Sequence, residues 1–452
     1  MSRAKLNLAS VAVPIALVFL FAPPPLRAQQ SPQAAPQPAP SAPSTVVAPP
    51  AYSGNVITAY SPGKDAYQKG AAYSAAHYRH FFIGALYSLV ILVLVLRGRI
   101  GPKYRDWAER ASSKRFVQVL IFAPLLLLTV AILGLPSDAW DQSLERSFGL
   151  SVQNWGSWIG DWITSQIMLL IVGTILVWIL YGVIRRSPRR WWFYFWLASL
   201  PVLLAVFFLQ PLVVEPLFFK FTPLQSSQPE LTAAIERVVH HGGMDIPPDR
   251  IFEMNASTKM TGLNAYVSGF GSSKRAVIWD TTIRKAATPE VLFVFGHEMG
   301  HYVLHHIPKE IAIDAVILLV VCFLGARLAA RMISRRGDRW AVRSVDDWAS
   351  LPALILAFSV LAFLAIPAFN AVSRHFEHEA DRYGLEVIHG IVPDAGQVAA
   401  HYFEKSGEIN LADPNPSAFD KFWMFDHPTR PERVHFVATY DPWSGGSPVY
   451  VR

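Results

Sequence analysis

A short run in the chain has the residue types and spacing of a metal-dependent hydrolase. His297 and His301 are four residues apart in His297-Glu298-Met299-Gly300-His301. On a helix, positions i and i+4 share a face, so the two imidazole nitrogens can converge on one zinc ion. Glu298 can then act as the general base toward water, whose pKa zinc lowers to about 7. The spacing predicts zinc-dependent hydrolysis, with His297 and His301 as ligands and Glu298 as catalytic base.

A catalytic zinc of this kind needs a third protein ligand and an open fourth position. The position that holds a third histidine in metzincins is occupied by Ile307. His305 and His306 have the wrong spacing, so we interpret them as polar residues at a membrane interface.

A better source of the third ligand lies further along the chain. Glu377 and Asp381 are one turn apart on a predicted helix. Glu377 can bind the metal while Asp381 holds a ligand histidine by its other ring nitrogen. From spacing alone, His378 or Glu379 can replace Glu377, and a solvated, charged helix end would contain the same residue types.

The first motif is preceded by the signals of a helix start. Thr288 suits the N-cap, Pro289 the first helical position, and Glu290 the positive end of the helix dipole. An apolar stretch then leads to the first histidine. We therefore expect the motif on a capped helix at the boundary between polar and membrane-buried sequence.

Most of the remaining chain is apolar. Hydrophobic residues make up 52% of the 452 residues and charged residues 16%, against roughly 25% charged in an ordinary soluble protein. A transmembrane helix needs about 20 apolar residues. Six stretches approach that length, at 81–96, 116–135, 162–184, 192–212, 311–328 and 349–372.

The six spans leave two polar regions, which carry the motifs. Neither region is large enough for an independent enzyme, but a hairpin of the last two spans would bring them together. We expect a mainly α, polytopic membrane protein with a small α+β catalytic domain. The expected segments are membrane helices one to four at 79–224, a first catalytic part at 225–306, helices five and six at 307–372, and a second catalytic part at 373–452.

The N-terminus has the pattern of an export signal. Arg3 and Lys5 precede an apolar run, so residues 1–28 are interpreted as a signal peptide, with an uncleaved anchor as the alternative. Residues 29–78 form a Pro/Ala-rich linker, whose uncharged part at 29–50 cannot bury a core. The one cysteine, Cys322, excludes an intrachain disulfide and a cysteine-based zinc cluster.

The net charge of +7 comes largely from three short loops, at 97–115, 185–190 and 327–343. They fall on one side of the membrane by parity, and the positive-inside rule makes that side cytoplasmic. Both polar regions then face the periplasm or exterior, across a bacterial inner membrane. The basic residues are therefore an orientation signal, and we expect a lipid bilayer and a peptide substrate, not nucleic acid, as partners.

Taken together, the motifs resemble the type I CaaX prenyl endopeptidase family and its relatives, the HtpX-type heat-shock membrane proteases. The resemblance rests on segments 297–301, 373–381, 216–224, 264–281 and 427–433. Smaller similarities extend the likeness from about residue 80 to the C-terminus.

The resemblance implies a gluzincin with one zinc ion per chain and a chamber within the membrane. Glu377 becomes the third zinc ligand, and Asp381 becomes the carboxylate behind a ligand histidine. Asn264 and His427 become the groups that contact the substrate carbonyl or the developing oxyanion. Arg433 is expected to be structural, in a pair with a carboxylate.

Two departures from the family bear on the substrate. Eukaryotic members have seven spans, the first near the N-terminus, where this chain has a signal-like segment and a linker. Their zinc faces the cytosol, whereas the charge asymmetry here points outward. Because prenylated CaaX proteins are cytosolic, processing or quality control of exported peptides is expected instead. The sequence indicates no oligomeric state.

Three alternatives stay open at this point. A transporter or channel with an accidental HExxH would need ionisable residues within its spans, and the six stretches are nearly free of charge. An intramembrane protease of the site-2 type would place His297 inside a hydrophobic span, but polar sequence flanks it. A zinc-binding pseudoprotease would lack a catalytic residue, yet every required residue is present.

Overall fold

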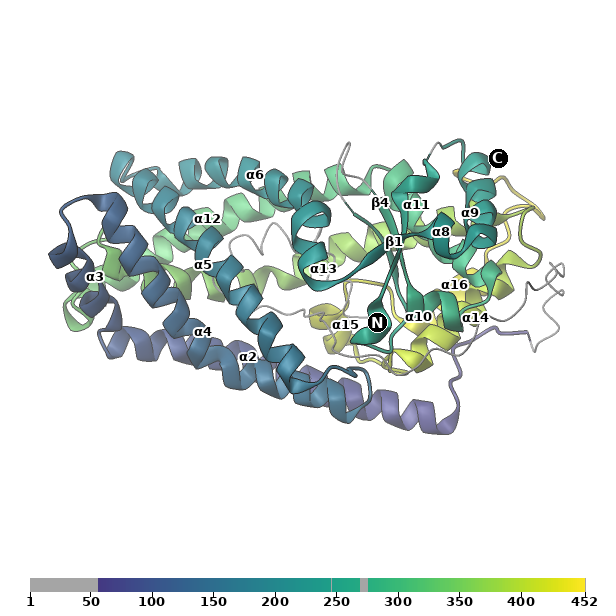
Figure 1. Cartoon of the computed structure of the whole chain (residues 1–452), viewed down its shortest axis with the longest axis horizontal. Helices are drawn as coiled ribbons and strands as arrows, with labels where there is room; N and C mark the ends of the chain where they lie inside the picture. Colours follow the sequence, from purple (N-terminus) through teal and green to yellow (C-terminus); the bar gives the residue numbers. More distant parts are fainter. Residues whose placement is uncertain (1–55, 245, 269–274, 452) are drawn as a thin grey trace.

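Long apolar helices occupy one end of the molecule and a smaller mixed part occupies the other (Figure 1). The computed structural model describes residues 56–244, 246–268 and 275–451. The predicted signal peptide or anchor at 1–28 and the uncharged part of the linker at 29–50 lie outside the described residues. Within the described chain the protein is mainly helical, as the sequence predicts.

Five of the described helices are long and apolar enough to cross a bilayer. They are α2 (Lys64–Arg97), α4 (Arg115–Ser147), α5 (Trp155–Arg186), α12 (His306–Trp340) and α13 (Leu351–Ile388). The fourth predicted span corresponds to α6 (Trp191–Leu209), which contains Pro201 and runs directly into the π-helix η2 (Gln210–Val214). Helix α6 is not among the five, so the expected number of six spans is corrected to five for the described chain.

The surface of these helices is apolar. Leu86 on α2, Ile171 on α5 and Val316 on α12 each expose about 60% of their side-chain surface. Exposed apolar area of this extent suits contact with lipid tails, where only helices and closed barrels satisfy their own backbone polar groups. On the inner side, the Tyr181 hydroxyl lies 2.7 Å from the Ser350 hydroxyl.

Helix α2 starts earlier than expected, inside the segment 29–78 that was predicted as a linker. Its N-terminal half is polar but packs against the mixed part, where the Tyr78 hydroxyl donates to Asp413 Oδ2 at 3.0 Å. The residues before it are also tied down, because the backbone N–H and carbonyl of Ile57 both bond to the Gln397 side chain. These contacts explain why the linker prediction fails for its last part.

The mixed part contains a four-stranded sheet with the order β1-β2-β4-β3. The strands are β1 (Phe221–Pro223), β2 (Ile251–Met254), β3 (Ala265–Ser268) and β4 (Arg275–Trp279). Strands β2 and β4 are parallel, and the two outer pairs are antiparallel. Around the sheet lie α9 (Pro229–His241), α10 (Asp280–Lys285), α11 (Thr288–Val303), α14 (Ala395–Ile409), α15 (Ala418–Met424) and α16 (Arg430–Thr439).

The remaining helices of more than three residues are short and peripheral to the site. They are α3 (Ile100–Ala111), α7 (Glu215–Phe218) and α8 (Leu224–Ser227). Helix α3 lies at the end of the molecule farthest from the sheet (Figure 1).

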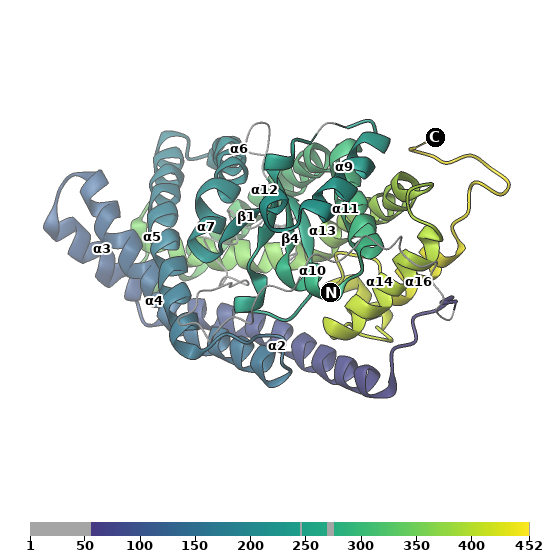
Figure 2. The same ribbon diagram turned by 45° about the vertical axis from the view of Figure 1, so that its right-hand side comes forward.

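One hydrophobic core joins the two polar regions. It contains Ile235 and Phe293 from the first region and Tyr383, Phe403 and Val434 from the second. Helices α12 and α13 pack against each other and so return the chain to this core. Helix α11 contacts both β3 and α13, and the turned view shows it next to α13 (Figure 2). The expected α+β unit, assembled from two separate stretches of sequence, is therefore present.

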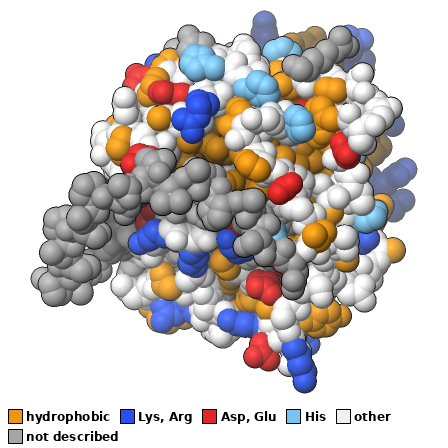
Figure 3. Space-filling model, turned by 90° about the vertical axis from the view of Figure 1, so that its right-hand side faces the viewer, with side chains coloured by type: hydrophobic (Ala, Val, Ile, Leu, Met, Phe, Trp, Pro, Cys, Tyr) orange, Lys and Arg blue, Asp and Glu red, His pale blue; other side chains and the backbone are white. Residues whose placement is uncertain are grey.

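The outer face of the mixed part differs from the helical end. Its surface carries charged side chains of both signs and several histidines among scattered apolar ones (Figure 3). Such a mixture is typical of a surface in water, because isolated apolar residues there are normal and only large apolar patches indicate contact with lipid or protein.

Candidate active site

The HExxH motif lies on α11, a helix buried along most of its length. The helix starts at Thr288, so the N-cap position belongs to Ala287, one residue before the expected cap. The Glu290 carboxylate accepts a hydrogen bond from the Ala287 N–H at 2.7 Å. It also forms an ion pair with Lys405 on α14 at 2.6 Å. These bonds fix the N-terminal end of α11 against α14, which sets the direction in which the motif points.

Small residues let α11 cross α13 closely. A Cβ atom at Gly384 would lie 2.9 Å from the backbone N of His297, a distance that real Cβ atoms do not tolerate. A Cβ at Gly300 would lie 3.2 Å from Cα of Ala380. Gly300 and Ala380 therefore belong to a seam of small residues that brings two backbones into contact. This contact places Glu377, one turn earlier on α13, beside the two motif histidines.

The three predicted ligands meet at one point. His297 Nε2 lies 3.3 Å from His301 Nε2 and 3.3 Å from Glu377 Oε2, and His301 Nε2 lies 3.3 Å from Glu377 Oε1. A tetrahedral metal ion with bonds of about 2.0–2.2 Å separates its ligand atoms by about 3.3 Å. Both Glu377 oxygens are buried, and histidine ring nitrogens face them. The three groups thus fit a tetrahedral metal ion, with one position left for water or substrate.

A second layer of contacts orients His297. Its Nδ1 lies 2.9 Å from Asp381 Oδ1, on the side of the ring opposite the metal-facing nitrogen. Arg433 on α16 in turn binds Asp381, with Nε donating to Oδ2 at 2.8 Å and Nη2 donating to Oδ1. Asp381 therefore lies on the side of His297 opposite the other predicted ligands, and Arg433 is paired with this carboxylate.

His306 is a residue that sequence reasoning missed. We interpreted it with His305 as interfacial, but His306 is fully buried, stacked on Phe376 with ring centroids 4.7 Å apart. Its Nδ1 lies 3.1 Å from Nδ1 of His301, and its Nε2 lies 3.2 Å from Glu379 Oε2. The interfacial interpretation therefore fails for His306, which follows the left-handed His305 (φ 55°) and lies against the motif, whereas His305 itself is exposed.

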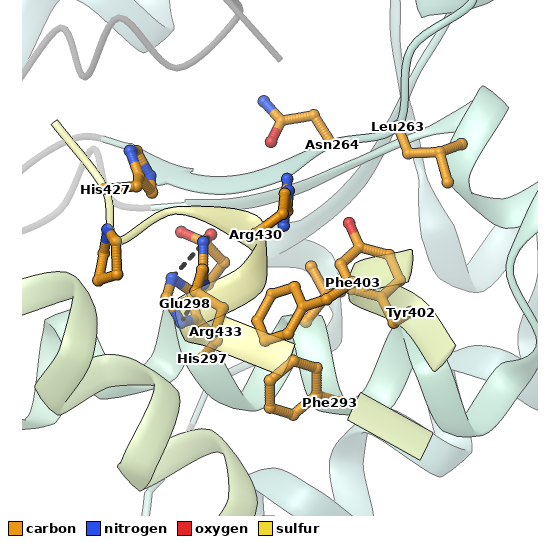
Figure 4. A pocket seen from close by; sticks show the side chains of 12 residues that line it. Leu263, Asn264, Phe293, His297, Glu298, Tyr402, Phe403, His427, Arg430 and Arg433 are labelled. Carbon is orange, nitrogen blue, oxygen red and sulfur yellow. Dashed lines mark hydrogen bonds and ion pairs between the residues drawn. The ribbon is translucent and has the colours of Figure 1, made fainter. Parts of the chain in front are cut away.

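The two residues expected to bind the substrate carbonyl line one pocket with Glu298, the predicted base (Figure 4). The Asn264 side-chain nitrogen is buried and has no hydrogen-bond partner in the described chain, so a donor is free in the pocket. His427 lies between Glu377 (Nε2 to Oε2, 3.0 Å) and Asp426 (Nδ1 to Oδ1, 2.8 Å). Burial disfavours the charged ring, but the two carboxylates raise the pKa of His427 to about 9.

The pocket draws its walls from four separate elements. They are the start of β3, α11, α14 and the segment leading into α16, with the lining residues Leu263, Asn264, Phe293, Val294, His297, Glu298, Tyr402, Phe403, His427, Pro428, Arg430 and Arg433. Every residue that the sequence proposed for catalysis therefore lies in or directly beside this pocket.

Comparison with known proteins identifies this arrangement. The model of peptidase family M48 matches residues 225–441, and the model of the CAAX prenyl protease N-terminal region, with five membrane helices, matches residues 49–220. An uncharacterized metalloprotease of Bacillus subtilis, YhfN, is 33% identical over 78% of this chain and 81% of its own length. The chain belongs to peptidase family M48. It is a multi-pass membrane metalloprotease.

More distant relatives of this M48 protease also match it over most of their length. The human CAAX prenyl protease 1 homolog is 25% identical over 83% of this chain and 86% of its own length. The crystal structure of Ste24p from S. mikatae superimposes with a TM-score of 0.70 at 22% identity, covering 82% of this chain and 88% of that one. The fold is therefore shared across nearly the whole described chain. Family membership decides against the transporter and channel alternative.

Proposed function

We propose that this protein is a zinc endopeptidase that cleaves exported peptides or proteins at the outer face of a bacterial inner membrane. The ligand set carries the proposal: two imidazoles and one carboxylate, with the three observed separations of 3.3 Å. Two histidines and a glutamate are a ligand set of catalytic zinc, which leaves one coordination position open. In this proposal one zinc ion is held by His297, His301 and Glu377.

Each chemical step can be assigned to a side chain. When bound, zinc polarises the scissile carbonyl and lowers the pKa of water. Glu298, buried beside His297, takes a proton from the attacking water and delivers it to the leaving amine. Asp381, held by Arg433, keeps His297 in the orientation and tautomer that a ligand needs.

Two side chains can stabilise charge on the substrate carbonyl. The unpartnered Asn264 amide donates a hydrogen bond to the oxyanion. His427, whose Nε2 faces Glu377 in this structure, is the second donor once its Nε2 turns from Glu377 to the substrate. One such donor typically contributes about 10²–10³ in rate. We therefore assign catalysis to Glu298, Asn264 and His427.

Metal analysis of the purified protein tests the zinc proposal. We expect one zinc per chain by mass spectrometry, cleavage of casein, loss of cleavage in a strong chelator, and recovery when zinc is restored. Cleavage that persists after complete metal removal would contradict the assignment.

The orientation follows from the distribution of charge. The catalytic part, which we assign to 225–306 and 373–452, lies at the end of the molecule opposite α3 and its basic loop (Figure 1). The membrane helices then belong to 79–224 and 307–372. By the positive-inside rule the basic end is cytoplasmic. An exported or outward-facing peptide is the substrate that such a site can reach, which favours this class over cytosolic CaaX proteins.

Cysteine labelling in intact cells tests the orientation. The native Cys322 is fully buried, so it gives a low background. Arg186 at the end of α5 and Arg237 on α9 are both exposed. With a membrane-impermeant maleimide, Arg237→Cys should be labelled and Arg186→Cys should be labelled only after lysis. The reverse pattern would refute an outward-facing site.

A further inference from the structure

The pocket beside the metal ligands contains two arginines with different surroundings. Arg430 and Arg433 lie one turn apart at the start of α16, and both line the pocket. Arg433 forms a two-bond pair with Asp381. Among the described residues, no hydrogen bond or ion pair joins Arg430 to a carboxylate, and its Nε is buried without a partner. Arg430 therefore brings a positive charge into the pocket that the described chain does not neutralise.

The neighbours of Arg430 hold it in place without cancelling its charge. Its guanidinium lies over the Phe403 ring, 5.3 Å from the centroid, and it shares the pocket with Tyr402 (Figure 4). Burial lowers the pKa of Arg430 to about 10, so the side chain stays charged at neutral pH. A buried charge without a partner is unfavourable, and arginine is the side chain best suited to bind a carboxylate through two parallel hydrogen bonds.

The lining of the pocket indicates what kind of group can meet this charge. Its volume is about 50 Å³, several times the roughly 10–15 Å³ that one water needs by the same measure. Phe293, Val294 and Leu263 supply apolar walls, while His297 and Glu298 line the side next to the metal ligands. An anionic group on an apolar stem, such as an acidic side chain or the last residue of a peptide, is complementary to these walls and to Arg430.

We propose that this pocket binds a carboxylate of the substrate and that Arg430 makes the enzyme prefer substrates that carry it there. The carboxylate belongs either to an acidic side chain next to the scissile bond or to the free C-terminus of the peptide. The proposal rests on the peptidase function proposed above, because the pocket is continuous with the residues assigned to catalysis.

Paired peptides test the preference. A casein fragment cleaved by the enzyme is remade as a quenched fluorogenic peptide, with Asp or Asn placed on either side of the scissile bond, and with a C-terminal acid or amide. We expect the wild-type kcat/KM for one acidic member to exceed that of its neutral partner by about tenfold or more, as for a lost charge-assisted hydrogen bond in a buried site. The peptide pair that shows the preference identifies the source of the carboxylate.

Two matched variants assign the preference to the pocket. Arg430→Gln should bring the acidic-to-neutral ratio close to one. Arg237→Gln, which removes an exposed arginine on α9, should leave the ratio at its wild-type value. The ratio compares two peptides with one enzyme preparation, so a partly unfolded variant does not distort it. If Arg430→Gln cannot be purified, Arg430→Lys should retain a reduced preference, because lysine keeps the charge without the two-bond geometry.

The outcomes are separable from those of the proposed function. A wild-type ratio near one for every pair, or an unchanged ratio in Arg430→Gln, would overturn the role of Arg430. Failure of the wild-type protein to cleave any of the peptides, acidic or neutral, would instead contradict the peptidase assignment.

Discussion

The two helices that carry the proposed metal ligands differ in almost every respect. Helix α11 has 16 residues, lies inside the mixed core, and brings two ligands and the base together within five positions. Helix α13 has 38 residues, is apolar enough to cross a bilayer, and supplies one ligand and the carboxylate behind His297 near its C-terminal end. One half of the site is therefore local in sequence. The other half depends on the packing of α13 against α11, which brings Glu377 to His297 although the two residues are 80 positions apart.

The largest expected effect comes from the α13 half. Glu377→Gln replaces a buried anionic ligand with a neutral amide, so we expect both bound zinc and peptide cleavage to be lost. Metal content by mass spectrometry and kcat/KM on casein peptides measure the two losses together. A variant that kept full metal occupancy would show that α11 alone holds the ion and would remove α13 from the site.

A change in the α11 half should separate chemistry from metal binding. Glu298→Gln removes the general base but none of the three ligands, so kcat/KM should fall by about 10²–10⁴ while zinc content stays at the wild-type level. Full activity in a protein of unchanged metal content would end the assignment of Glu298.

A smaller effect is expected from Asp381, the residue of α13 that orients His297 on α11. Asp381→Asn keeps the size of the side chain but weakens its bonds to His297 Nδ1 and Arg433. Loss of such a partner typically costs about 10–100-fold in metal affinity or activity. Zinc competition with a chelator of known affinity measures it. If affinity is unchanged, the carboxylate is a structural partner of Arg433 alone.

The smallest effect concerns the crossing itself. Gly384→Ala puts a methyl group 2.9 Å from the His297 backbone, and overpacking of this kind costs about 1–3 kcal/mol of stability. Gly160→Ala on α5 is the matched control, because a Cβ there meets nothing within 4 Å, and alanine favours a helix by up to about 1 kcal/mol. Thermal unfolding in the same detergent compares them. Equal melting temperatures would mean that the two helices do not need this close contact.

The same division explains what the sequence could predict. His297, Glu298 and His301 follow from spacing within one helical turn, and the apolar stretches follow from composition. The choice of Glu377 over His378 or Glu379 needed the family resemblance, because spacing does not say which face of α13 meets α11. Gly384 and Ala380 decide that face by allowing contact, and small residues look neutral in a single sequence.

Three other features could not be predicted from sequence patterns because they depend on tertiary contacts. His306 contacts His301 because His305 takes a positive φ, which sequence does not signal for a histidine. Helix α2 begins at Lys64 because its polar turns are held by residues more than 300 positions away, such as Asp413. The unpaired charge of Arg430 becomes apparent only in the folded chain, where α11, α14 and α16 line one pocket.

The unbroken course of α13 has a mechanical consequence. From Leu351 to Glu377 the helix rises about 39 Å at 1.5 Å per residue, with Pro367 as its one internal proline. A rod of this length is packed inside the core of the helical end at its start and contacts α11 near its other end. We expect a change in bilayer thickness that alters the tilt of α13 to shift Glu377 relative to the two histidines. The rate of peptide cleavage should then depend on the lipid composition of the membrane, as it depends on pH and on the supply of metal.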